Sequence, residues 1–154
     1  MEVYKNIELP SWLKDLISSQ GNSGSVKNMF DTKKNDLDLW ISSILGSIIV
    51  STENWFNYVV PNDPGECTYY RWHNESGYDQ DAVPGTHVAT VWISGSTGCG
   101  GIYQWLDEQG MLYEMPFEPN TLFISDTKTI HRVTEYLGTE PRMSFTLCFN
   151  YIKA

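Results

Sequence analysis

The second half of the chain alternates short β-prone runs with turn residues, and this pattern limits the possible folds more than any other feature. From Cys67 onward the runs are separated by turn signals that contain Gly, Pro or Asn. They cover residues 68–73, 87–94, 101–106, 121–125, 131–136 and 144–152. Many short strands at this spacing predict an all-β sandwich or barrel.

The last run indicates which side of its strand faces a core. Successive residues of a strand point to opposite faces, so one face is polar and the other apolar. The polar face carries Arg142, Ser144, Thr146, Cys148 and Asn150, and the apolar face carries Met143, Phe145, Leu147, Phe149 and Tyr151. We expect the apolar face to pack against N-terminal helices and the polar face to point into a barrel interior that holds something polar.

The first part of the chain is predicted to supply those helices. Residues 10–17 place apolar side chains at helical spacing, with Pro10 or Ser11 as the start. Residues 21–34 are polar and predict a loop. A second helix is expected from about Asn35, and its predicted inward side chains are Leu37, Leu39, Trp40, Ile44 and Leu45.

The length of 154 residues suits one domain with a single core. We therefore expect a mostly β (α+β) domain over residues 1–154, in which residues 1–50 form supporting helices and a loop on one outer face. The β-barrel core is expected over residues 65–152.

Charge and cysteine content argue against several classes of protein. A net charge of −9 without a basic stripe argues against nucleic acid as a partner. Cys67, Cys99 and Cys148 are an odd count with no CxxC pair, so a disulfide framework is not expected. Without a signal peptide or an apolar run long enough for a membrane span, the expected location is the cytoplasm.

Two histidines and one carboxylate form the candidate chemical centre. His73 and Glu75 are two residues apart, and His131 follows 58 positions after the first histidine. Such a set matches the facial triad that binds a non-haem Fe(II) and leaves coordination positions open. Arg142 adds a cation that can bind a carboxylate cosubstrate at two points. The remaining histidine, His87, is interpreted as structural or near the pocket.

These residues and their flanking sequences resemble the 2-oxoglutarate/Fe(II)-dependent dioxygenases, most closely the prolyl-4-hydroxylase-like branch. Residues 70–75 (Tyr-Arg-Trp-His-Asn-Glu) are similar to the Tyr-x-x-His-x-Asp segment of that family, and Gly100-Gly101 matches its double glycine. Residues 120–125 with the following His131, and Gly138 with residues 142–147, resemble its later strands. The resemblance covers about residues 65–152.

The resemblance implies a double-stranded β-helix, also called a jelly roll, with His73, Glu75 and His131 as the Fe(II) ligands. Arg142 would pair with the distal carboxylate of 2-oxoglutarate, and Ser144 or Tyr70 would add a hydrogen bond. The implied reaction uses O2, converts 2-oxoglutarate to succinate and CO2, and hydroxylates a substrate C–H bond. Ascorbate is an optional accessory reductant, and the substrate is a small molecule or a peptide, with peptidyl-proline as one candidate.

Some alternatives stay open at this stage. The family usually has Asp where this chain has Glu75, so Asp79 and Asp81 are alternative carboxylate ligands. A cupin-type metal enzyme is a second hypothesis, although the His-x-His cluster usual in cupins is absent. A third is a non-catalytic jelly-roll module that binds carbohydrate or protein. Substrate identity and oligomeric state are not determined by these patterns.

Overall fold

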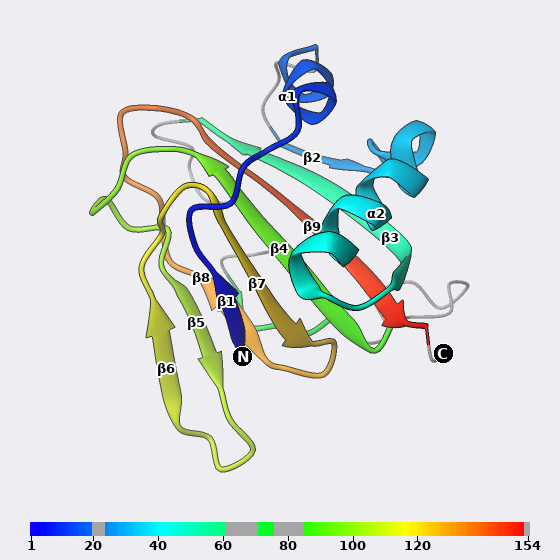
Figure 1. Cartoon of the computed structure of the whole chain (residues 1–154). Coiled ribbons are helices and arrows are strands. Elements are labelled where there is room, and N and C mark those ends of the chain that lie inside the picture. Colours follow the sequence, from blue (N-terminus) through cyan, green and yellow to red (C-terminus); the bar gives the residue numbers. More distant parts are fainter. Residues whose placement is uncertain (20–23, 61–70, 76–84, 153–154) are drawn as a thin grey trace.

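The computed structural model describes residues 1–19, 24–60, 71–75 and 85–152, which form two antiparallel sheets (Figure 1). In spatial order the larger sheet contains β1 (Glu2–Tyr4), β7 (Thr121–Asp126), β4 (His87–Ser94), β9 (Arg142–Tyr151), β3 (Ile49–Val59) and β2 (Gly24–Lys27). The smaller sheet contains β6 (Leu112–Met115), β5 (Tyr103–Leu106) and β8 (His131–Val133). The prediction of a mostly β domain is therefore confirmed.

Helices lie against one face of the larger sheet (Figure 1). They are α1 (Ser11–Ser18), the short 3-10 helix η1 (Asp31–Lys33) and α2 (Lys34–Leu45). Their buried side chains share one apolar cluster with the sheet, and this cluster includes Leu13, Ile17, Leu37, Ile41, Phe56, Val91, Leu122, Phe145, Leu147 and Phe149. Helix α2 ends at Gly46, whose φ of 71° lies in the left-handed region that glycine adopts without strain.

Strand β9 has the two-faced character that its sequence predicts. Phe145 and Phe149 are fully buried in the cluster shared with the helices. Arg142, Ser144 and Thr146 line a cavity on the opposite side of the sheet. The cavity also contacts residues of β5 and β8, so the two sheets face each other across it.

A second apolar cluster closes part of the space between the sheets. Its buried members are Trp92, Tyr103, Phe117 and Phe123. The ring centroids of Tyr103 and Phe123 are 4.7 Å apart, and those of Trp92 and Phe117 are 5.2 Å apart. Since these rings come from both sheets and from the segment after β6, they fix the spacing of the cavity walls.

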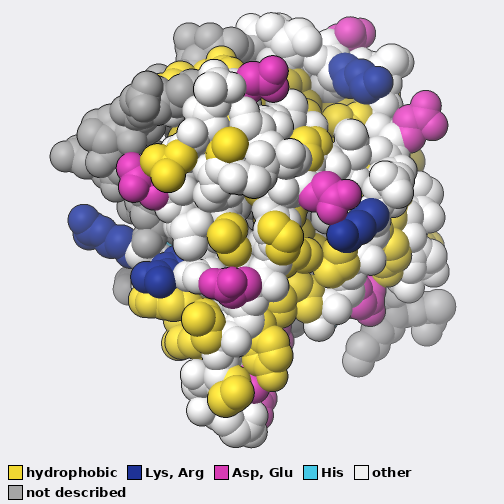
Figure 2. Space-filling view, turned by 90° about the vertical axis from the view of Figure 1, so that its left-hand side faces the viewer, with side chains coloured by type: hydrophobic (Ala, Val, Ile, Leu, Met, Phe, Trp, Pro, Cys, Tyr) yellow, Lys and Arg dark blue, Asp and Glu magenta, His cyan; other side chains and the backbone are white. Residues whose placement is uncertain are grey.

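The β5–β6 hairpin extends away from this core. Figure 2 shows apolar side chains gathered over the projecting hairpin, where Met111, Leu112 and Tyr113 are exposed. Trp105 of β5 stacks on Tyr113 with ring centroids 5.6 Å apart. Among the helices in the described ranges, none combines the length and apolarity needed to cross a membrane.

Two predictions about the N-terminal part are wrong. The expected loop at residues 21–34 contains β2 and η1, because β2 gains its structure by pairing with β3, as in Val26 opposite Phe56. Leu39 was expected to face inward, yet its side chain is 67% exposed. Residues two apart on a helix differ by about 200°, so burial of Leu37 turns Leu39 to the solvent.

Several strands were missed or differ in length. Strands β1, β3 and β6 were not predicted, and β3 lies between β9 and β2 although it precedes the expected barrel boundary at residue 65. Strand β8 ends at Val133 rather than at residue 136. The predicted strand at 68–73 falls partly outside the described residues, and within them only His73 forms an isolated bridge, with His131.

Two leucine variants, one at a buried position and one at an exposed position, test the assignment of the core. Leu147 is 0% exposed and Leu39 is 67% exposed. We expect Leu147→Ala to lower the free energy of unfolding by about 2–5 kcal/mol, because it leaves a cavity in the core. Leu39→Ala should change it by less than about 0.5 kcal/mol. Equilibrium urea unfolding measures both values, and equal losses would contradict the assigned core.

Candidate metal and cosubstrate site

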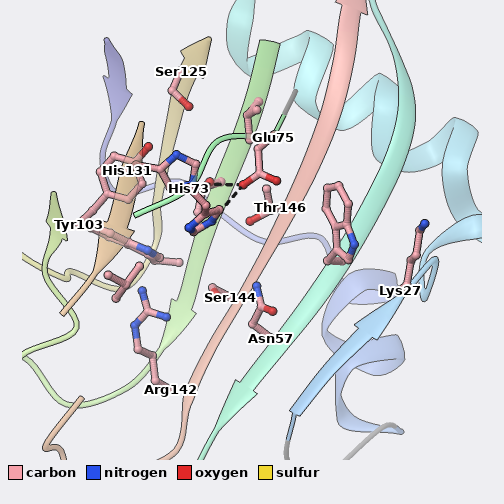
Figure 3. A pocket seen from close by; sticks show the side chains of 15 residues that line it. Lys27, Asn57, His73, Glu75, Tyr103, Ser125, His131, Arg142, Ser144 and Thr146 are labelled. Carbon is pink, nitrogen blue, oxygen red and sulfur yellow. Dashed lines mark ion pairs between the residues drawn. The ribbon is translucent and has the colours of Figure 1, made fainter. Parts of the chain in front are cut away.

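His73, Glu75 and His131 converge at one point of the cavity (Figure 3). The Nε2 atom of His131 lies 3.1 Å from Oε1 of Glu75, and Nε2 of His73 lies 3.5 Å from the same oxygen. One ligand atom from each residue lies within 4.8 Å of the others. Residues far apart in the sequence thus present two imidazole nitrogens and one carboxylate oxygen to a common centre.

Backbone hydrogen bonds bring these residues together. The N–H of His73 donates to the carbonyl of His131 at 3.0 Å, and the N–H of His131 donates to the carbonyl of His73 at 2.8 Å. The N–H of Glu75 donates to the carbonyl of Thr127 at 2.9 Å. The segment that carries the His-x-Glu pair is therefore fixed to the start of β8 and to the turn after β7.

The other ring nitrogen of each histidine is held by a backbone carbonyl. Nδ1 of His73 lies 2.6 Å from the carbonyl oxygen of Arg71, and Nδ1 of His131 lies 2.9 Å from that of Thr129. A carbonyl oxygen can only accept, so the hydrogen of each neutral ring is on Nδ1. In this neutral form Nε2 carries the lone pair that a metal ligand requires, and in the protonated form Nε2 donates a hydrogen bond to Glu75 instead.

The electrostatics favour charge in this cluster. Burial raises the pKa of Glu75, but hydrogen bonds and charge from His131 and His73 outweigh it and lower the pKa to about 2. Burial lowers the pKa of His73, but the hydrogen bond and charge of Glu75, with the carbonyl of Arg71, raise it above its ordinary value. A cation is stabilised between these groups, whether it is a proton or a metal ion.

The donor set fits a divalent metal with open coordination positions. Two neutral imidazoles and one carboxylate are the ligands of mononuclear non-haem Fe(II) sites. The sequence resemblance would place an aspartate where this chain has Glu75, and the carboxylate of Glu75 contacts both Nε2 atoms. Asp79 and Asp81, the alternative ligands, lie outside the described residues.

Arg142 stands in the wall of the same cavity, whose volume is about 340 Å³. Its side chain is only 3% exposed, and its guanidinium carbon lies 4.8 Å from the ring centroid of Phe117 and 6.0 Å from that of Trp92. In Figure 3 the guanidinium points toward the His-Glu-His cluster. A Cβ added to Gly101 would lie 3.1 Å from Nε of Arg142, so this glycine leaves room for the arginine.

The other sequence-predicted residues have different positions. Ser144 lines the cavity, as predicted, whereas Tyr70 lies outside the described residues. His87 is absent from the cavity lining and packs on Phe149 and Tyr151, with ring centroids 5.6 Å and 4.9 Å away. These two contacts agree with the interpretation of His87 as a structural residue.

Several lining residues were missed by the sequence analysis. Lys27 lies on β2, Trp55 and Asn57 lie on β3, and Tyr103 lies on β5. Tyr103 stacks on His131 with ring centroids 5.3 Å apart, and burial raises its pKa. Trp55 and Asn57 are two residues apart, so they share one face if the segment is a strand. Only the pairing of β3 with β9 shows that this face is the one toward the cavity.

Comparison with known proteins finds similar structures but no similar family model or curated sequence. No protein-family model matches the sequence, and no curated protein matches it. The structure is similar to a prolyl-4-hydroxylase from Pseudomonas putida, with a TM-score of 0.62 and 16% identity over 99% of this chain and 92% of that one. It is also similar to a 2OG-Fe(II) oxygenase family oxidoreductase from Burkholderia pseudomallei, with a TM-score of 0.68 and 8% identity over 96% and 83% of the two chains.

A further similar structure is EctD from S. alaskensis with 2-oxoglutarate and 5-hydroxyectoine, with a TM-score of 0.63 and 12% identity over 97% of this chain and 71% of that one. The chain therefore has the jelly-roll fold of the 2OG-Fe(II) oxygenases. The double-stranded β-helix predicted from the sequence resemblance is confirmed at the level of the fold.

The metal ligands can be tested with two of the three histidines. We expect His131→Ala to weaken binding of Fe(II) or Co(II) by at least about tenfold, because even the loss of a group that supports a ligand costs that much. His87→Ala should bind the metal as the unmodified protein does. Anaerobic metal titration followed by absorbance measures both, and equal affinities in the two variants would contradict the assignment.

The raised pKa of His73 predicts the direction of a pH effect. Protons compete with the metal for the imidazole, so metal affinity should fall as the pH decreases through this raised pKa and level off above it. Glu75, with a pKa of about 2, stays ionised throughout this range. Co(II) titrations between about pH 5.5 and pH 8 would show the decline. An affinity independent of pH would count against His73 as a ligand.

Proposed function

We propose that this protein is an Fe(II)- and 2-oxoglutarate-dependent oxygenase that hydroxylates a C–H bond of its substrate. The observation that supports this most is the pairing, in one cavity, of the His73-Glu75-His131 cluster with the buried guanidinium of Arg142. The first set suits a metal with open positions, and the second suits a carboxylate. Together they match the two ends of a metal-chelating keto acid.

The reaction balances with these components alone. The substrate R–H, O2 and 2-oxoglutarate are converted to R–OH, succinate and CO2. One oxygen atom of O2 enters the substrate and the other enters succinate, and the keto acid supplies the electrons as its C1–C2 bond breaks. Iron, when bound, supplies the redox chemistry that O2 requires.

Arg142 would hold the distal carboxylate of 2-oxoglutarate. Phe117 and Trp92 pack beside its guanidinium and exclude water, which strengthens a charge-assisted hydrogen bond to a carboxylate. Ser144, next on the same strand face, adds a hydroxyl to this end of the cavity. These residues would orient the keto acid so that its other end points to the metal.

His73, Glu75 and His131 would present their donor atoms from one side. The carbonyls of Arg71 and Thr129 hold the two rings by Nδ1, so the ligand geometry exists before the metal binds. Because all three residues line the cavity, a metal held by them would be accessible to cosubstrate and substrate from within it.

The arginine also discriminates among the alternative functions. A cupin-type enzyme that works without 2-oxoglutarate has no need of a buried carboxylate-binding cation opposite the metal. A non-catalytic module would not need three converging metal donors. The similarity to a prolyl-4-hydroxylase keeps peptidyl-proline among the candidate substrates.

The test compares two arginine variants. Arg142→Leu should raise the dissociation constant of 2-oxoglutarate by at least about 30-fold, because truncating one partner of a buried charge pair costs at least about 2 kcal/mol. Arg132→Leu is the control, because Arg132 contacts Trp72 and Gln104 and is absent from the cavity lining. Anaerobic titration of the Fe(II)-loaded proteins with 2-oxoglutarate, followed by absorbance, measures each constant.

Arg142→Lys guards against a folding defect, since it keeps the charge and should bind 2-oxoglutarate more tightly than Arg142→Leu. The absence of any 2-oxoglutarate-dependent absorbance change in the unmodified protein would refute the proposed function. Metal binding that persists without 2-oxoglutarate binding would then favour the cupin-type alternative.

A further inference from the structure

A second basic residue, Lys27, also lines the cavity, but it lies too far from Arg142 for one small ligand to contact both. Lys27 lies opposite Trp55, Trp55 lies opposite Thr146, and Thr146 lies opposite Thr90. Directly opposed residues of antiparallel strands share a face, so these side chains form one row across the inner face of the larger sheet. Arg142 lies four positions before Thr146 along β9.

This register separates the two cations. With strands about 4.8 Å apart and residues about 3.4 Å apart along a strand, the Cα atoms of Lys27 and Arg142 are roughly 17 Å from each other. A five-carbon dicarboxylate with bonds of roughly 1.5 Å is shorter than about 8 Å. Because strand side chains stand roughly perpendicular to the sheet, one such molecule does not contact both. Figure 3 shows Lys27 and Arg142 on opposite sides of the view.

Lys27 forms an ion pair with Glu53 at the cavity. Their Nζ and Oε1 atoms are 3.9 Å apart, with the Lys27 side chain 45% exposed and the Glu53 side chain 11% exposed. An ammonium group has three N–H donors, so Lys27 can contact Glu53 and still donate to a ligand. Trp55, its cross-strand neighbour, adds an aromatic side chain to the same cavity wall.

The cavity wall carries two separate cations that anionic groups of a ligand can contact. Among the described lining residues the formally charged side chains are Lys27, Arg142 and Glu75, if the histidines are neutral. A divalent metal and a dianionic cosubstrate would cancel each other, which leaves two cations and one carboxylate. Glu53 lies 3.9 Å from Lys27 and offsets part of this charge, so Lys27 and Arg142 are two separate local cations for anionic groups of a ligand.

We propose that the substrate is a small carboxylate with an apolar body, which places its carboxylate on Lys27 and its body against Trp55. This inference rests on the proposed function, because it assigns Arg142 to the cosubstrate. The cavity of about 340 Å³ lies near the lower end of ligand-pocket volumes, so substrate and cosubstrate together must be compact. A residue inside a peptide has no free backbone carboxylate, so this class differs from peptidyl-proline.

The experiment uses pairs of ligands that differ only in the anchoring group. The probes are free and N-acetylated apolar α-amino acids, each compared with its own carboxamide. Binding is measured by anaerobic calorimetry on protein loaded with Fe(II) and 2-oxoglutarate. We expect at least one carboxylate to bind at least about tenfold more tightly than its carboxamide, which corresponds to about 1.4 kcal/mol.

Lys27→Gln should abolish this preference, and Lys27→Arg should retain it. Lys33→Gln is the matched control, because Lys33 forms a similar exposed pair with Asp36, 3.8 Å away, and is absent from the cavity lining. Trp55→Leu should weaken the carboxylate and its carboxamide alike, since it removes the apolar contact and leaves the ammonium.

Three results would overturn the inference: equal binding of carboxylates and carboxamides, an unchanged preference in Lys27→Gln, or no binding by any carboxylate of the panel. Lys27→Gln should also keep the 2-oxoglutarate affinity of the unmodified protein. If that affinity fell, Lys27 would belong to the cosubstrate site and the inference would be wrong. Failure of the proposed function is distinct, because 2-oxoglutarate would then not bind to the unmodified protein.

Discussion

Strand β9 is the constraint on which the rest of the structure depends. It pairs with β3 on one side and β4 on the other, so it lies inside the larger sheet. Its apolar face buries Phe145 and Phe149 under the helices, and its polar face places Arg142 and Ser144 in the cavity. A shift of one residue in its register would exchange these faces, so the stability of the core and the chemistry of the cavity specify the same register.

The His73-Glu75-His131 cluster depends on a much smaller contact. Residues 71–75 form no strand, and the backbone bridge between His73 and His131 joins them to β8. Two hydrogen bonds of 3.0 Å and 2.8 Å close this bridge, and the bond from Glu75 to Thr127 adds a third. A bound cation would stabilise the same arrangement, because it bridges side chains that the backbone already holds together.

The sequence predicted the parts of the site that have local signals. The alternation in β9 identified Arg142 and Ser144 as inward residues. The His-x-Glu pair became a candidate only in combination with His131 and Arg142 and through the family resemblance. Lys27 and Trp55 were missed because nothing near them in the sequence says which strand they pair with. Their place in the cavity comes from β2 pairing with β3 and β3 with β9, and such long-range registers are tertiary properties.

Glu75 shows how the fold accommodates a glutamate where the sequence resemblance would place an aspartate. A regular antiparallel ladder continuing from the His73–His131 bridge would place residue 75 opposite residue 129. The N–H of Glu75 instead donates to the carbonyl of Thr127, two residues further along. The pairing therefore slips at this point, and the carboxylate still lies within 3.5 Å of both Nε2 atoms. The extra methylene of glutamate is compatible with this slipped backbone, so the substitution leaves the donor set of a facial triad intact.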